Sequence, residues 1–365
     1  GNYLYLWQRW MFGADGETFV SKLEFTLIDY KGRVLKEIST LSNDDPASLI
    51  VDEDPVLTLA PSGEIGVAWR RRVIKNDNGG RAENWNIYFA ILDGQGVLTQ
   101  PAINLTNNEL WIPSDSIALG APYFWNIRLT VNQNNHYALI WHRESHEPPT
   151  GGCLADCKLN NIFYTLLDEN GNPIKDITKL TKNEVSDHKT LSSPTITAVN
   201  EDHWLLVYNH INGGMAYVVL DSQGEIFRPR SFIPETGNGW SPVALQPIGG
   251  EKIILVWTAW TGSNPQIHSI TIDSLSFQPS SEIQVFETPQ ASTGGDYAAL
   301  TPDALGNVIL TWMDFSSNDR QHLYYALLDA EGDLVTPPLF FYTAQDQSGD
   351  QGKVETGFTG LGSTT

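Results

Sequence analysis

Apolar and aromatic residues recur along the chain in short runs that end in an aromatic residue, and polar stretches separate these runs. The last residue of the run is Trp in five of six copies and Tyr in the fourth. The runs end at Trp7, Trp69, Trp141, Tyr208, Trp257 and Trp312. Short apolar runs with many β-branched and aromatic residues predict β-strands. A pattern that returns six times predicts a repeat architecture.

A second strand is predicted after each of these runs, and each second strand ends in an Asp that opens a turn. The six aspartates are Asp29, Asp93, Asp168, Asp221, Asp273 and Asp329. Five of them are followed three residues later by Gly, where a hairpin turn needs a positive φ, while Asp273 is followed by Ser-Leu-Ser. We interpret these aspartates as turn formers rather than as calcium ligands.

Each unit of the repeat is long enough for four strands. A third strand is predicted before each aromatic run, beginning at a proline such as Pro55 or Pro122, and a fourth after the Gly turn. We therefore predict one all-β domain, a β-propeller of about six four-stranded blades. The predicted blades span residues 1–45 with 354–365, 54–108, 121–183, 193–236, 241–289 and 296–345. Because Trp7 comes too early for a preceding strand, the C-terminal segment is predicted to pair with the N-terminal blade and close the ring.

The motif of an apolar strand, Trp, a polar stretch and Leu-Asp-x-x-Gly resembles the repeats of secreted bacterial β-propellers of the sialidase-like and surface-protein kind. The resemblance covers nearly the whole chain and implies the fold. No copy carries the Ser-x-Asp-x-Gly-x-Thr-Trp turn that is typical of sialidase repeats. A fold by itself implies no reaction.

The charge of the chain narrows the classes of partner. The chain has 22 Lys and Arg against 43 Asp and Glu, a net charge of −21. This argues against nucleic acid and anionic membrane surfaces, which need a basic surface. No apolar stretch approaches the roughly 18 residues of a membrane helix. We expect a protein or glycan partner at the loop face, or assembly into a larger extracellular structure.

The residues directly after the aromatic positions are expected to lie in loops on one face of the propeller. Arg9, Arg71 and Arg143 share one register in three successive blades, and converging guanidinium groups suit a carboxylate, sulfate or phosphate. His210, Trp260 and Asp314 complete this candidate ligand face. The alternative is that each Arg pairs with an acidic neighbour or packs over an aromatic ring.

Aromatic residues expected in loops are a second candidate contact surface. They are Trp85, Trp111, Trp240 and Trp260. Such rings stack on sugars or cap a blade.

Both cysteines, Cys153 and Cys157, lie in a long insertion of the third blade. A local disulfide is predicted, which indicates an oxidising location outside the cell. A zinc site formed with His142 and His146 and a pair of free thiols are the alternatives. No cofactor is otherwise expected, with calcium or zinc as the only candidates.

These features favour a secreted or cell-surface propeller that serves as a binding or scaffold module in protein or glycan recognition. Partner contacts are expected on the long loops after Trp69 and Trp141. One alternative is a carbohydrate-active enzyme or lectin that recognises an acidic sugar, with Glu144 and Asp314 as candidate carboxylates. Another is a structural subunit of an extracellular assembly. An enzyme is the less favoured interpretation, because no complete catalytic set is recognisable.

Overall fold

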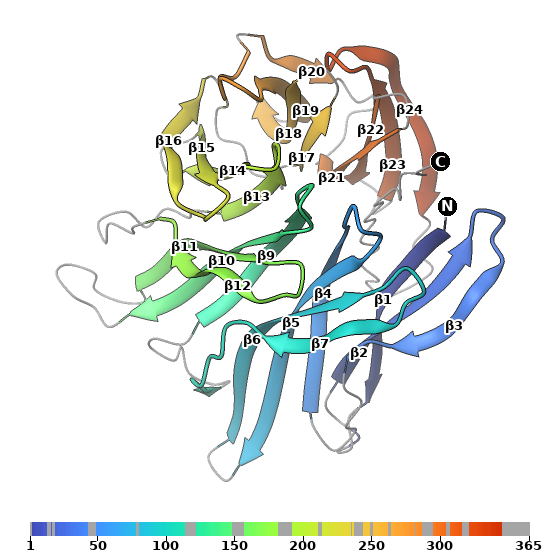
Figure 1. Cartoon of the computed structure of the whole chain (residues 1–365), viewed down its shortest axis with the longest axis vertical. Coiled ribbons are helices and arrows are strands. Elements are labelled where there is room, and N and C mark those ends of the chain that lie inside the picture. Colours follow the sequence, from blue (N-terminus) through green and yellow to red (C-terminus); the bar gives the residue numbers. More distant parts are fainter. Residues whose placement is uncertain are drawn as a thin grey trace. The chain divides into compact units, whose positions relative to one another are not determined.

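The described part of the chain contains β-strands and the turns and loops between them, and no helix (Figure 1). The computed structural model describes residues 2–12, 16, 19–42, 49–77, 80–113, 122–147, 157–181, 192–210, 214–234, 236, 244–248, 251–261, 264–280, 282–286, 295–303, 307–315 and 321–344. These residues form 24 strands. The chain divides into an N-terminal unit, residues 1–192, and a C-terminal unit, residues 193–365. Each unit has its own set of sheets.

The N-terminal unit contains two sheets. The strands of the first sheet are β1 (Asn2–Phe12), β2 (Phe19–Asp29), β3 (Val34–Thr40), β4 (Leu49–Leu59), β5 (Ile65–Asp77), β6 (Gly80–Leu92), β7 (Leu98–Asn104) and β8 (Ile112–Pro113). Antiparallel pairing gives the orders β1-β2-β3 and β4-β5-β6-β7, and one parallel bridge from Ser21 to Val51 joins them. The second sheet has the order β12-β11-β10-β9. Its strands are β9 (Pro122–Val131), β10 (Tyr137–Glu147), β11 (Cys157–Leu167) and β12 (Pro173–Lys179).

The C-terminal unit contains three sheets, each of four strands in chain order. The first consists of β13 (Ser192–Ala198), β14 (His203–His210), β15 (Gly214–Asp221) and β16 (Ile226–Ile233). The second consists of β17 (Ala244–Ile248), β18 (Lys252–Thr261), β19 (Asn264–Asp273) and β20 (Gln284–Phe286). The third consists of β21 (Gly295–Pro302), β22 (Val308–Phe315), β23 (Gln321–Leu328) and β24 (Leu334–Ala344).

The repeated tryptophans form the cores between successive strand groups within each unit. Trp69 packs with Leu23 and Phe25, which lie on β2. Trp141 packs in the same way against β6, Trp257 against β14 and β15, and Trp312 against β18. All four indole side chains are almost completely buried. In these four repeats the aromatic residue that ends the run is thus a core residue, as the sequence pattern predicts.

The turns opened by the repeated aspartates are confirmed. The Asp93 carboxylate accepts hydrogen bonds from the backbone N–H groups two and four residues later, at 2.9 and 2.8 Å. Gly96 follows with φ +72° and donates its N–H to the Asp93 carbonyl. The same arrangement occurs at Asp29, Asp168, Asp221 and Asp329. The departure at Asp273 is also real, because its turn is closed by a non-glycine residue, Phe277, with φ +52°.

Two sequence-based predictions about strand limits are wrong. The strands do not end at the aromatic residue: β1 continues beyond Trp7 to Phe12, and β5 beyond Trp69 to Asp77. The residues after the tryptophans therefore belong to long antiparallel hairpins rather than to loops. Likewise, whereas β9 does begin at Pro122 as predicted, β4 does not begin at Pro55, which lies inside the strand at a register shift. A proline is tolerated there because a bulge does not need its N–H group.

The blade count and the closure of the ring remain predictions. In the described part of the chain β1 pairs with β2 alone. The predicted closing segment, 354–365, lies outside the described residues.

Candidate functional site

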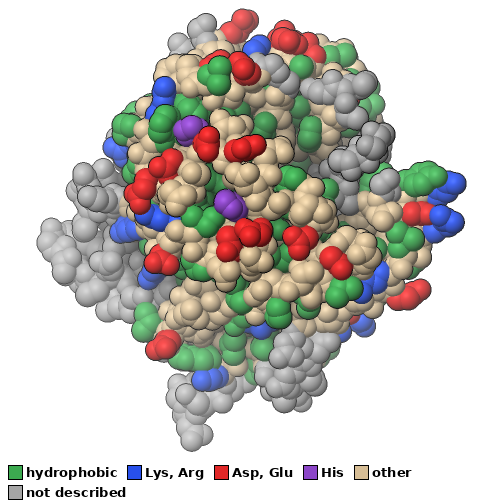
Figure 2. Space-filling view, viewed as in Figure 1, with side chains coloured by type: hydrophobic (Ala, Val, Ile, Leu, Met, Phe, Trp, Pro, Cys, Tyr) green, Lys and Arg blue, Asp and Glu red, His purple; other side chains and the backbone are tan. Residues whose placement is uncertain are grey.

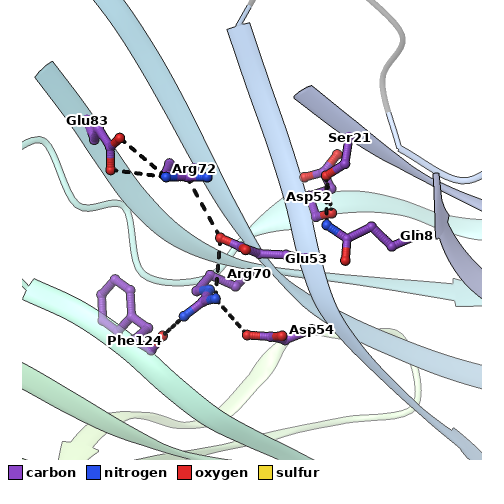
Figure 3. A network of polar contacts seen from close by, with 9 residues as sticks. All are labelled: Gln8, Ser21, Asp52, Glu53, Asp54, Arg70, Arg72, Glu83 and Phe124. Carbon is purple, nitrogen blue, oxygen red and sulfur yellow. Dashed lines mark hydrogen bonds and ion pairs between the residues drawn. The ribbon is translucent and has the colours of Figure 1, made fainter. Parts of the chain in front are cut away.

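A run of three acidic residues on β4, Asp52 to Asp54, overlaps in register with a run of three arginines on β5, Arg70 to Arg72. In the antiparallel register Asp52 pairs with Arg71 and Glu53 with Arg70. Side chains alternate between the two faces of a strand, so this double run of charges divides into two separate groups. On one face, Glu53, Asp54, Arg70, Arg72 and Glu83 gather, and we call this group the acid–arginine cluster (Figure 3). On the other face lies the Asp52–Arg71 pair.

A bulge in β4 positions the exposed end of the cluster. The register with β5 shifts between Glu53 and Val56, and Asp54 has φ +53°. A positive φ is costly for any residue other than Gly, and bulges of this kind redirect a side chain. Asp54 consequently presents its carboxylate with 37% of the side chain exposed, whereas the Glu53 side chain is 14% exposed.

Arg70 connects the bulge to the neighbouring sheet. Its Nη2 lies 2.7 Å from Asp54 Oδ2 and 3.3 Å from Glu53 Oε1. Its Nη1 donates to the backbone carbonyl of Phe124 on β9 at 2.8 Å. The side chain is only 4% exposed, so these contacts hold the guanidinium group in one place.

Arg72 lies on the same face of β5, beside Glu83 of β6. Its Nη1 lies 3.3 Å from Glu83 Oε1, and its Nε lies 3.9 Å from Glu53 Oε1. The guanidinium groups of Arg70 and Arg72 lie 4.7 and 5.1 Å from the centre of the Trp85 ring. Cation–π contacts of this kind keep both groups close to a buried aromatic side chain.

Glu53 is the buried carboxyl group of the cluster. Burial raises its pKa, and although Arg70 and Arg72 act in the opposite direction, the net shift is upward. Asp54, one residue later, is the exposed carboxylate. The guanidinium groups of Arg70 and Arg72 are hydrogen-bond donors, and the carboxyl oxygens of Glu53, Asp54 and Glu83 are acceptors. The cluster can therefore both donate and accept hydrogen bonds.

The Asp52–Arg71 pair on the opposite face is fully enclosed. Asp52 has no exposed surface, and its carboxylate accepts from Arg71 Nε at 2.7 Å, Arg71 Nη2 at 2.9 Å and the Trp69 indole N–H at 2.9 Å. Burial alone would lower the pKa of Arg71, but its hydrogen bonds and charge interactions with Asp52 and Tyr88 raise it. The Asp52 carbonyl accepts from Ser21, which in turn accepts from Gln8 (Figure 3). This pair is built to hold strands together.

The three arginines predicted to converge have distinct surroundings. Arg9 is 60% exposed and pairs with Glu24 at 3.1 Å, whereas Arg71 is held by Asp52. Arg143 lies 5.3 Å from the centre of the Phe163 ring. For Arg9 and Arg71 the pairing with an acidic neighbour, left open as an alternative, is what the structure shows. That the three act together on one ligand remains a prediction.

The other predicted ligand-face residues lie in the C-terminal unit. His210 Nε2 lies 3.4 Å from Arg230 Nη1, and burial together with the charge of Arg230 lowers its pKa. Trp260 is on β18 and Asp314 on β22, and both side chains lie outside the described part of the structure.

The cysteine insertion lies largely outside the described residues. Cys153 is not described. Cys157 is the first residue of β11 and His146 lies within β10, but neither side chain is described. His142 is buried with its Nε2 2.9 Å from Asn160 Oδ1, and burial lowers its pKa. The disulfide and the zinc alternative therefore stay predictions. No metal-binding group of three or more His, Cys, Asp or Glu residues occurs among the described side chains.

Not all of the tryptophans that the sequence places in loops lie in loops. Trp85 is a buried residue of β6. Trp111 is partly buried and lies 3.8 Å from Lys75 Nζ, measured to the ring centre. Trp240 lies outside the described residues.

The sequence analysis did not identify Asp52, Glu53 and Asp54. It also did not predict that Arg70 and Arg71 lie on opposite faces of β5 with different partners. The available signal was the run Asp-Glu-Asp followed about twenty residues later by Arg-Arg-Arg. Opposite charges on paired strands stabilise one register, so the two runs together predict a pairing.

Comparison with known proteins identifies the fold. No family model and no curated protein matches the chain. Among solved structures, a sialidase of Streptococcus pneumoniae is similar with a TM-score of 0.54 and 12% identity, over 83% of this chain and 62% of that one. An ulvan lyase bound to -[GlcA(1-4)Rha3S]- has a TM-score of 0.56 and 10% identity, over 92% and 78%. An α-L-arabinanase of Penicillium chrysogenum has a TM-score of 0.50 and 11% identity, over 90% and 94%.

These identities are too low to carry a reaction from one protein to another, so the likeness concerns the fold. The chain spans less than two thirds of the length of the sialidase. No helix long and apolar enough to span a bilayer occurs in the described part of the chain. The chain is an all-β protein whose fold is similar to that of sialidase-like and glycan-active β-propeller enzymes.

Proposed function

We propose that this chain is a glycan-binding β-propeller, a lectin or a carbohydrate-active enzyme, and that the acid–arginine cluster contacts the glycan. The observation that carries the proposal is the cluster itself. Five charged side chains form a connected group that includes the strained bulge at Asp54, and binding groups are often placed at such bulges. Solved proteins of similar fold include a sialidase, an ulvan lyase and an arabinanase. Carboxylate and guanidinium groups supply the hydrogen bonds that a hydroxyl-rich ligand needs.

A scaffold that recognises only a protein partner has less support than glycan recognition. The similar solved structures named above all take their names from action on glycans. The acidic-sugar version of the hypothesis relied on arginines free to bind an anion. Arg71 is bound to Asp52 through two hydrogen bonds, so its guanidinium is already engaged.

The test is glycan-array binding by the purified chain and by an Arg72→Gln/Glu83→Gln variant. The double change removes both members of an ion pair, and Glu53, which Arg72 also approaches at 3.9 Å, keeps Arg70 at 3.3 Å. Binding to at least one glycan class by the parent chain, and its loss in a variant with an unchanged melting temperature, is the expected result. Absence of binding and of turnover on every glycan would contradict the proposal.

Arg9→Gln is the matched control. Arg9 is exposed, and its partner Glu24 retains Lys22 at 3.1 Å, so the change leaves no buried charge unpaired. Binding is expected to be unaffected. If Arg9→Gln abolishes binding while the double variant binds normally, the contact site is the arginine face and not the acid–arginine cluster.

We also propose that the blades number six and that segment 354–365 supplies the missing strand beside β1. In support, β2 is the one strand that pairs with β1 among the described residues, so the other edge of β1 has no described pairing partner. An extracellular or cell-surface location is proposed on the spacing of Cys153 and Cys157. An intact mass lower by two hydrogen atoms than that of the reduced chain would support it, and the mass of the reduced chain would contradict it.

A further inference from the structure

The charges around Asp54 bear on which class of sugar the acid–arginine cluster suits. Arg70 lies within ion-pair distance of both Asp54 and Glu53, and Arg72 lies between Glu53 and Glu83. Each guanidinium group is therefore already compensated by carboxylates. An anionic sugar entering the cluster would meet three carboxylates and two neutralised cations.

The net charge of the chain acts in the same direction. It is −21, and Figure 2 shows Asp and Glu side chains at many places on the drawn face. A field of this sign reduces the local concentration of anions. Uncharged sugars experience no such repulsion.

The accessible group of the cluster is a hydrogen-bond acceptor. Asp54 is 37% exposed, compared with 20% for Arg72, 15% for Glu83 and 14% for Glu53. Arg70 holds Asp54 Oδ2 at 2.7 Å, so the carboxylate is oriented before any ligand arrives. An oriented carboxylate accepts short, charge-assisted hydrogen bonds from hydroxyl groups.

A second polar residue occupies the equivalent position on the neighbouring sheet. β9 has its own register shift, opposite Trp141, and Asn126 there has φ +52°, as Asp54 does opposite Trp69. β4 lies against β9, and the hydrogen bond from Arg70 to the Phe124 carbonyl ties the two bulged segments together. Asn126 is partly exposed, and its amide can both donate and accept.

We propose that Asp54 and Asn126 form a subsite for the hydroxyl groups of an uncharged sugar residue, and that the acid–arginine cluster does not select carboxylated or sulfated sugars. This inference rests on the proposed function. In it, Asp54 accepts from one or two hydroxyl groups, Asn126 contributes a donor and an acceptor, and Arg70 keeps Asp54 in position.

The experiment compares neutral arabino-, xylo- and galacto-oligosaccharides with glucuronate-containing and sulfated oligosaccharides, at 50 mM and 500 mM NaCl. The proteins are the full chain, Asp54→Asn, Asn126→Ala and the control Asp176→Asn, which removes one exposed carboxylate from β12 of the same unit. The parent chain is expected to bind a neutral class with an affinity that salt does not weaken. Asp54→Asn is expected to weaken this binding about tenfold or more, Asn126→Ala to weaken it, and Asp176→Asn to leave it unchanged.

Two results would overturn the inference while leaving the proposed function intact. One is binding confined to acidic oligosaccharides and weakened by salt. The other is neutral-sugar binding that both Asp54→Asn and Asn126→Ala leave unchanged. No binding to any oligosaccharide would remove the proposed function as well. If Asp54→Asn fails to fold, Asn126→Ala decides alone, because Asn126 takes part in no ion pair of the cluster.

Discussion

Replacing Asp52 by Asn is expected to destabilise the N-terminal unit by about 3–5 kcal/mol, the usual cost of breaking a buried ion pair. Asp52 has no exposed surface, and the Arg71 side chain is 9% exposed, so water cannot replace the lost charge. Two unit charges about 4 Å apart at an effective dielectric constant of about 20 interact by roughly 4 kcal/mol, which is of the same order. In addition, Asn has a single acceptor oxygen for the three N–H groups that Arg71 and Trp69 now donate to Asp52.

Thermal and urea unfolding of the purified chain measure this change. For a unit of about this size, each kcal/mol shifts the melting temperature by about 2–4 °C, so a decrease of roughly 6–20 °C is expected. Asp176→Asn is the control. It changes an exposed residue of β12 and is expected to stay within about 0.5 kcal/mol of the parent.

A double-mutant cycle with Arg71→Met separates the pair from its surroundings. Once the guanidinium charge is gone, the loss of the Asp52 charge no longer leaves a cation unpaired. The double variant should therefore be more stable than the sum of the single changes predicts, by about 0.5–3 kcal/mol. A loss below about 1 kcal/mol for Asp52→Asn, or strict additivity in the cycle, would refute the reasoning.

Three further predictions follow from the geometry. Gly96→Ala should lower the free energy of unfolding more than Gly32→Ala, because a Cβ at Gly96 would lie 2.9 Å from the Phe25 ring and a Cβ at Gly32 would meet nothing within 4 Å. Both residues have a positive φ, which alone costs about 1–2 kcal/mol for Ala. Chemical denaturation of the two variants measures the difference. Because the pKa of Glu53 is raised in the folded state, its contribution to stability is present at low pH and is lost as the pH rises from 4.5 through its folded-state pKa. The free energy of unfolding of Glu53→Gln should therefore equal or exceed that of the parent chain at pH 7 and show no gain at pH 4. Deleting segment 354–365 should lower the melting temperature and promote aggregation; an unchanged melting temperature would contradict ring closure by this segment.

The repeat could be predicted from the sequence because the interactions that define it are local. In each turn the Asp carboxylate bonds to N–H groups two and four residues later, and the following Gly takes a positive φ. Such contacts depend on a few consecutive residues, so a short motif suffices to recognise them. The burial of the repeated tryptophans could also be predicted from the sequence, because each ends an apolar run that must face a core.

The bulge and the acid–arginine cluster escaped prediction because proline and charge are normally signs of a strand end. Pro55 suggested the start of β4, and Arg70 to Arg72 suggested a loop after Trp69. In the structure the hairpin continues, and each of these three arginines has a carboxylate partner on an adjacent strand. Polar residues can extend a strand when their partners compensate the cost of burial.

The three arginines in one register show why a position in a repeat does not specify a role. Each follows its tryptophan by two residues and therefore lies beside the residue that pairs with that tryptophan across the hairpin. That residue is Glu24 opposite Trp7, Tyr88 opposite Trp69 and Phe163 opposite Trp141. The first arginine accordingly forms an ion pair and the third lies over a ring. The second lies over the Tyr88 ring and also binds Asp52, a residue of a different strand. The repeat determines where the guanidinium lies, whereas the residue on the adjoining strand determines whether its charge is available to a ligand.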